Sequence, residues 1–350
     1  MKRLVRSITS RLPVRGLSIL FDRLGPVFFR SPSPARLRLG KIELEFDLSN
    51  RVMRTMYFGI YEKDLLGYMR TLLRPGDTFI DVGANIGYLS AYARELVGPK
   101  GAVHSFEPVP AYGDALANAV RSAGVANVRV VGQALGDREG TVPIKISGKE
   151  NIGWNTIVPG LMKERAGIQT LEVPVTTLAR YLDDHDIADV RLIKIDVEGA
   201  ELLVLRGLAP WLAQGRRPQI VTELCPEACT LLGSSPGEIF ALMEKFGYRA
   251  YSFCRQGLYR IYCRGVRLQP LSPQQVSRTM DIVWKPGFTQ HCPVRKLHAV
   301  VLPPSPQPSP PEAGGEGVGD VAGFSYHKAL NRFHFFPSPP MGERVMVRGK

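Results

Sequence analysis

The stretch Thr78-Phe79-Ile80-Asp81-Val82-Gly83-Ala84-Asn85-Ile86-Gly87 decides the expected fold. Its first five residues are largely apolar and predict a buried strand, and the two glycines after them predict a tight turn. Apolar residues then recur at helical spacing between Leu89 and Val97, until Gly98-Pro99 ends the pattern. A strand, a glycine turn and a helix in this order are typical of a parallel α/β sheet.

The same alternation continues between about residues 41 and 284. Further strands are predicted at 102–106, 128–131, 141–146, 192–195 and 220–222, and further helices at 114–123, around 202–205 and at 236–246. Ser235-Pro236-Gly237-Glu238 has the form of a capping box. Residues 248–253 and 258–262 predict a hairpin. We therefore expect an α/β fold with a mostly parallel seven-stranded sheet, helices on both faces and a C-terminal antiparallel hairpin.

The formal net charge of +13 is concentrated at the two ends of the chain. Residues 1–40 hold nine basic residues and one acidic residue, and residues 285–350 hold eight basic and four acidic residues. Residues 41–284 are nearly neutral, with 28 basic and 27 acidic residues. A nucleic-acid interface needs basic residues clustered on the folded part, so we expect no specific nucleic-acid partner.

Charge and composition together predict three parts: a basic N-terminal arm (1–40), a central domain (41–284) and a tail (285–350). Prolines and glycines dominate the tail from residue 303 onward, which predicts disorder because little apolar surface can be buried there. We interpret the basic arm as a solvated segment or one weakly attracted to a membrane surface. No stretch reaches the roughly 18 apolar residues of a transmembrane helix.

The five cysteines form no Cys-x-x-Cys pair. We therefore expect free thiols and no metal site. Free thiols fit a reducing compartment and favour a cytoplasmic location. The basic N-terminus is not followed by the apolar run of a signal peptide.

Four predicted strands end on a carboxylate: Asp81, Glu107, Asp196 and Glu223. Ligands of open parallel sheets bind outside the carboxyl ends of the strands, at the point where the strand order reverses. One acidic residue at such a position is unremarkable. Four of them predict a polar crevice along one edge of the sheet.

The loop from Gly83 to Gly87 has the spacing G-x-x-x-G, whereas a dinucleotide site needs G-x-G-x-x-G. Asp81 would repel a pyrophosphate but favours a ligand that carries ammonium and sulfonium charge. Glu107 suits the two hydroxyls of a ribose as a bidentate acceptor. These features favour S-adenosylmethionine over NAD. An NAD(P)-dependent oxidoreductase and a non-catalytic nucleotide-binding module remain as alternatives.

Several motifs, taken in order, resemble those of the FkbM family of methyltransferases. They are Asp81–Gly87, Phe106-Glu107-Pro108 and Lys194-Ile195-Asp196-Val197-Glu198-Gly199-Ala200-Glu201, together with Gly59-Ile60-Tyr61-Glu62, Val175-Thr176-Thr177-Leu178 and Val221-Thr222-Glu223. The resemblance covers roughly residues 57–250. It implies a Rossmann-like class I methyltransferase fold, S-adenosylmethionine as cofactor and methyl transfer to a hydroxyl oxygen, typically of a sugar or polyketide, with a lipid as a further candidate.

The resemblance also implies roles for individual residues. The cofactor would be held by Asp81, Gly83, Ala84, Asn85 and Gly87 in the loop, by Glu107 at the ribose and by Gln133 and Ala134 near the adenine. The turn that begins at Asp196 would face the transferred methyl group. A hydroxyl acceptor must lose a proton, so Asp196 is the first candidate for the base and Glu198 the second. Alternatively, Asp196 caps the following helix, or Glu198 points into the start of that helix.

Overall fold

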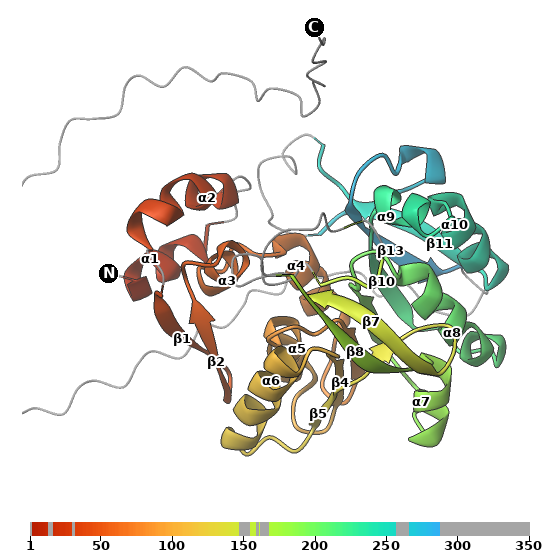
Figure 1. Cartoon of the computed structure of the whole chain (residues 1–350), viewed down its shortest axis with the longest axis horizontal. Coiled ribbons are helices and arrows are strands. Elements are labelled where there is room, and N and C mark those ends of the chain that lie inside the picture. Colours follow the sequence, from red (N-terminus) through yellow and green to blue (C-terminus); the bar gives the residue numbers. More distant parts are fainter. Residues whose placement is uncertain are drawn as a thin grey trace, which may run out of the picture. The chain divides into compact units, whose positions relative to one another are not determined.

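The structure, a computed structural model, describes residues 2–12, 17–29, 32–146, 155–158, 161, 168–256 and 266–287 (Figure 1). All of them belong to the compact unit Met1–Cys292. The predicted strand at 258–262 and the expected tail beyond residue 287 lie outside the described residues.

An eight-stranded sheet runs through the centre of this unit, in the order β12-β11-β13-β10-β9-β3-β4-β5. The parallel strands are β3 (Thr78–Val82), β4 (Ala102–Phe106), β5 (Val128–Val131), β9 (Leu192–Ile195) and β10 (Gln219–Leu224). The antiparallel strands are β11 (Tyr248–Phe253), β12 (Leu268–Pro270) and β13 (Met280–Pro286). The mostly parallel Rossmann-like fold is confirmed.

The antiparallel edge differs in detail from the prediction. β11 lies between β13 and the three-residue strand β12, so its described partners come from later in the chain than residues 258–262. β12 brings the described sheet to eight strands, where seven were expected.

Side chains of the central strands alternate between two apolar cores. Phe79 packs with α4 (Lys63–Leu72), α5 (Tyr88–Val97) and α6 (Pro110–Ser122), whereas Ile80 packs with α7 (Leu178–Asp184), α8 (Glu201–Ala213) and α10 (Pro236–Lys245). Successive strand residues point to opposite faces, so a sheet covered on both sides needs apolar residues at every position. This is why the strands read as continuous apolar runs.

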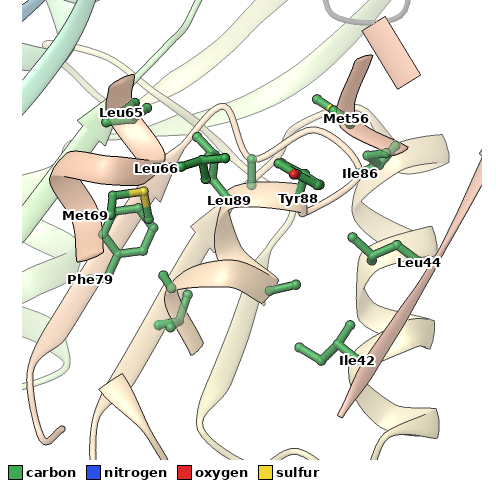
Figure 2. Close-up of a cluster of buried hydrophobic side chains, with 14 of the residues drawn as sticks. Ile42, Leu44, Met56, Leu65, Leu66, Met69, Phe79, Ile86, Tyr88 and Leu89 are labelled. Atoms are coloured by element: carbon green, nitrogen blue, oxygen red, sulfur yellow. The ribbon is translucent and has the colours of Figure 1, made fainter. Parts of the chain in front are cut away.

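The first core extends into the N-terminal part of the chain. Ile42 and Leu44 on β2 (Ile42–Asp47) and Met56 on α3 (Arg51–Tyr57) belong to the same buried cluster as Tyr88 and Leu89 (Figure 2). β2 pairs along its whole length with β1 (Pro34–Leu39). The expected boundary at residue 40 is therefore wrong, because it falls in the turn of a hairpin that packs on the sheet domain.

A separate three-stranded sheet contains β6 (Ala134–Leu135), β7 (Gly140–Ile146) and β8 (Gln169–Thr176), in the order β6-β8-β7. β7 corresponds to the strand predicted at 141–146. The predicted capping box at Ser235 is wrong in its hydrogen bonds: α10 begins at Pro236 as expected, but the Ser235 side chain makes no capping bond. Pro236 itself favours the helix start, because its fixed φ suits the first helical position.

Candidate active site

The site lies at the carboxyl ends of the parallel strands. From β3 the chain proceeds through β4 to β5 and then crosses to β9 on the other side of β3. The strand order therefore reverses between β3 and β9, the position where open α/β sheets bind ligands. Asp81, Glu107 and Asp196 come from the strands on both sides of this point.

The glycine turn folds tightly over the end of β4. The backbone N–H groups of Gly83 and Ala84 both donate to the carbonyl oxygen of Phe106, each at 2.9 Å. Gly83 has φ +82°, Gly87 has φ +83° and Asn85 has φ +52°. Left-handed backbone costs glycine little and other residues more, so the turn depends on both glycines and stores strain at Asn85.

Glu107 is buried beneath this turn. Its Oε2 accepts from the Asn85 N–H at 2.7 Å and its Oε1 accepts from the Val109 N–H at 2.9 Å. Each carboxylate oxygen retains a further acceptor position, as a bidentate contact with a diol requires. Burial raises the pKa of Glu107 to about 7.

A first pocket opens above Glu107. Among its lining residues are Gly83, Asn85, Glu107, Gln133, Ala134, Asp196 and Glu198, seven of the ten residues expected from the sequence. Asn155 and Ile157 also line it, from the connection between β7 and β8. Gly87 lines neither this pocket nor the next, since it caps the start of α5.

A second pocket adjoins the first at the glycine turn. Asp81 and Ala84 line it, with Tyr61, Glu62 and Glu223 among the others. Both pockets are lined by Gly83, Asn85, Asp196 and Glu198. The candidate base and its neighbour Glu198 thus lie where the two pockets meet.

Asp81 is almost fully buried. Its Oδ2 accepts a hydrogen bond from the Ser90 hydroxyl at 2.5 Å, and Ser90 in turn contacts the Ser105 hydroxyl at 2.7 Å. Burial raises the pKa of Asp81 to about 6, although the bond from Ser90 opposes this rise. A nearby positive ligand would favour its charged form.

A buried cation lies beside Asp196. The Nζ atom of Lys194, 1% exposed, is 3.6 Å from Asp196 Oδ2 and 3.2 Å from Asp281 Oδ1. Burial alone would lower the pKa of Lys194, but Asp196 and Asp281 raise it well above its usual range. β10 places Glu223 in register with Asp281, so Glu223 joins Lys194, Asp196 and Asp281 as a fourth ionisable group of this cluster.

The remaining carboxyl groups of the cluster favour their neutral form. Burial, reinforced by Asp196, raises the pKa of Glu198, and burial, reinforced by Asp281, raises that of Glu62. Asp196 and then burial raise the pKa of Glu223. Like charges this close cannot all ionise, so protons or a cationic ligand must neutralise most of them.

The hydrogen bonds at the start of α8 show whether Asp196 caps this helix. The residue that accepts bonds at the start of α8 is Glu201, whose Oε1 receives the N–H groups of Val197 and Gly199 at 3.3 and 3.1 Å. Ala200 is the N-cap. Asp196 therefore does not cap α8. Glu198, at φ +51°, lines both pockets.

Asp196, Glu198 and Glu223 carry carboxylate oxygens that lie within 4.8 Å of one another. Oxygen ligands at this spacing can hold a hard divalent cation. They can equally share protons or face a cationic ligand, and Lys194 already supplies one positive charge to the group.

The charges of the two pockets distinguish between cofactors. Among the described residues, every formally charged side chain that lines them is a carboxylate: Glu62, Asp81, Glu107, Asp196, Glu198 and Glu223. Such a lining opposes a pyrophosphate and fits a ligand with ammonium and sulfonium groups. The residues therefore suit S-adenosylmethionine.

A parallel sheet whose strand order reverses between β3 and β9, a G-x-x-x-G turn and acidic pockets together define a Rossmann-like class I methyltransferase. A family model described as the methyltransferase FkbM domain matches residues 81–250. The chain belongs to the FkbM methyltransferase family, and S-adenosylmethionine is its cofactor. The resemblance seen in the sequence is confirmed, and an oxidoreductase is excluded.

Three relatives agree with this membership. The 31-O-demethyl-FK506 methyltransferase FkbM of Streptomyces tacrolimicus is 32% identical over 201 residues, which cover 50% of this chain and 74% of the relative. Methyltransferase sdnD of Sordaria araneosa is 28% identical over 42% of this chain and 71% of the relative. Methyltransferase 1 of Beauveria bassiana is 29% identical over 38% of this chain and 59% of the relative.

Sequence reasoning assigned no role to several residues of the site. In the sequence, Tyr61 and Glu62 belong to a family motif that carries no assigned role. In the structure both line the second pocket, and Glu62 has a strained, left-handed φ of +46°. Asp281 carried no local signal, because only the pairing of β13 with β10 brings it to Lys194. Lys194, a charged residue inside an apolar strand, was the available clue.

Proposed function

We propose that this methyltransferase transfers a methyl group to a hydroxyl oxygen of a small organic acceptor of the sugar, lipid or polyketide type. The observation that carries the proposal is the position of Asp196. Its side chain is 19% exposed, lines both pockets and has a buried cation 3.6 Å away. When bound, S-adenosylmethionine supplies an electrophilic methyl group on a sulfonium centre.

Asp196 acts as the base in this proposal. As the acceptor oxygen gains the methyl group, the hydroxyl proton passes to an Asp196 carboxylate oxygen. Glu198, Glu62 and Glu223 are less available to accept a proton, because their raised pKa values keep these carboxyl groups protonated. Their neutral carboxyl groups can instead donate hydrogen bonds to the acceptor.

Lys194 positions Asp196 without contacting the acceptor. It is 1% exposed and is held from the other side by Asp281. Alignment of the two reactants supplies most of the rate in a displacement of this kind, so a fixed carboxylate matters as much as a basic one. Glu107 and the glycine turn would hold the cofactor in the first pocket.

The Streptomyces relative supports oxygen as the accepting atom, because its name describes a 31-O-demethyl substrate. The free thiols of Cys225, Cys229 and Cys254 support a reducing compartment such as the cytoplasm.

Transfer of isotopically labelled methyl groups to a panel of acceptors tests the proposal. Hydroxylated sugars, lipids and polyketides form one arm, and amines and thiols of matched skeleton form the other. We expect labelled product only in the hydroxyl arm, and we expect Asp196→Asn to form it about 10²–10⁴-fold more slowly. Product from neutral amines alone would overturn the proposal, since such acceptors need no base. Binding of the cofactor without any transfer would favour the non-catalytic alternative.

A further inference from the structure

The two N-terminal helices expose apolar side chains to an unusual degree. Among the described residues, seven large hydrophobic side chains are exposed, and six of them lie on α1 (Lys2–Thr9), α2 (Leu17–Phe28) or the residues just after α1. These six are Leu4 (66% exposed), Ile8 (52%), Leu12 (39%), Leu24 (45%), Val27 (66%) and Phe28 (66%). Contiguous exposed apolar surface marks an interaction site more often than single scattered residues do.

The exposed residues follow helical spacing. Leu4 and Ile8 are four residues apart on α1, and on α2 Val27 and Phe28 follow Leu24 by three and four residues. Side chains at these separations share one face of a helix. Each helix thus presents an apolar face outward.

The inward faces of both helices already have partners. The Thr9 hydroxyl donates to the carbonyl oxygen of Phe58 at 2.7 Å, and Lys63 Nζ donates to the carbonyl oxygens of Thr9 and Leu12 at 3.1 and 2.6 Å. The Phe21 ring centroid lies 4.7 Å from that of Phe58. α2 packs against α3 (Figure 1). The outward residues are therefore not a displaced part of the core.

The charge of this segment identifies the partner. Residues 1–40 hold nine basic residues and one acidic residue, and the side chains of Arg11 and Arg23 are exposed. Apolar faces flanked by basic residues suit the interface of an anionic bilayer, where apolar side chains insert and Lys or Arg meet the headgroups. A second copy of the chain would have to offer acidic residues opposite, and residues 41–284 carry almost no net charge.

We propose that α1 and α2 form a docking surface for anionic membranes. None of the helices in the described part of the chain has the length and apolarity to cross a bilayer. α1 is tied through Lys63 to the segment that carries Glu62, so docking would hold the second pocket near the membrane surface.

Co-sedimentation of the full chain with vesicles tests the surface. We expect binding to phosphatidylcholine vesicles that contain phosphatidylglycerol and little binding to phosphatidylcholine alone. Binding weakens as the salt concentration rises from about 0.1 M to about 1 M, because salt screens the headgroup attraction. The double variant Leu4→Ser/Ile8→Ser should bind the anionic vesicles about tenfold or more weakly, since two inserted side chains are removed.

Leu231→Ser is the matched control, because Leu231 is 43% exposed on α9 (Pro226–Leu231), outside the docking surface. It binds vesicles like the parent chain. Arg11→Gln/Arg23→Gln, which removes no apolar contact, weakens binding to anionic vesicles only. Equal binding by Leu4→Ser/Ile8→Ser and the parent overturns the proposal, as does the absence of any vesicle binding. Light scattering that shows a dimer dissociated by the same double variant assigns the surface to a second copy instead.

Discussion

The main chain of Asp196 passes directly against Gly83: a Cβ atom added to Gly83 would lie 1.9 Å from the carbonyl oxygen of Asp196. The Asp196 N–H also donates to the carbonyl oxygen of Val82 at 3.0 Å. The cofactor turn and the candidate base are therefore one packed unit, and a change in the first displaces the second.

Gly83→Ala should weaken cofactor binding by at least about tenfold and destabilise the fold beyond the roughly 1–2 kcal/mol of left-handed strain. The added methyl group must push Asp196 away. Gly215→Ala is the control, because Gly215 has a similar φ of +87° but open space around its Cβ position. Thermal unfolding and titration calorimetry measure both effects. Equal destabilisation by the two variants would show that the contact with Asp196 is unimportant.

Glu107→Gln should weaken binding of S-adenosylmethionine and S-adenosylhomocysteine by about 1.5–3 kcal/mol, because hydrogen bonds to a charged acceptor are lost. Calorimetry on both ligands measures the change. Glu172→Gln, at an exposed residue of β8, serves as the control. Unchanged affinity in a folded Glu107→Gln protein would remove Glu107 from the ribose site.

The affinity for S-adenosylmethionine should rise with pH up to about 7. The free protein holds a proton on Glu107 below its raised pKa of about 7, and the bidentate contact requires the carboxylate. Binding therefore releases a proton, and the affinity falls by on the order of tenfold per pH unit below the pKa. Calorimetry in buffers of different ionisation enthalpy counts the protons. The release near pH 7 should vanish in Glu107→Gln; if it persists there, another group is responsible.

Asp196→Asn should lower kcat by about 10²–10⁴-fold, since it keeps the size of the side chain but removes the base. Cofactor affinity and melting temperature should change much less. Asp183→Asn, an exposed residue on α7, is the control. A rate that disappears with a chelator and returns with Mg²⁺ would instead make Asp196, Glu198 and Glu223 metal ligands.

Lys194→Met should lower kcat and change cofactor affinity much less, because Asp196 loses the buried cation 3.6 Å away that fixes its position. It should also destabilise the fold by about 3–5 kcal/mol, because Asp281 loses its buried partner. Lys245→Met, exposed on α10, controls for the loss of a lysine. A merely structural Lys194 would lower the melting temperature and leave the kcat of the folded protein unchanged.

The sequence by itself determined the parts of this protein that depend on neighbours along the chain. The run Thr78–Val82 is apolar because both of its faces are covered, and Gly83 and Gly87 are required where the backbone is left-handed. The same local signals placed Glu107 and Asp196 at strand ends. Only the family resemblance assigned Gln133, Ala134 and Glu198 to the site.

Only the tertiary structure decided which distant residues meet. The charge cluster joins Glu62, Lys194, Glu223 and Asp281 from four segments, and no periodicity in the sequence links them. The packing of Thr9 and Phe21 on Phe58, and of Leu12 on Lys63, was likewise hidden, because a basic composition resembles that of a solvated arm. Strand register and helix packing are set by long-range contacts, whose partners a local pattern does not name.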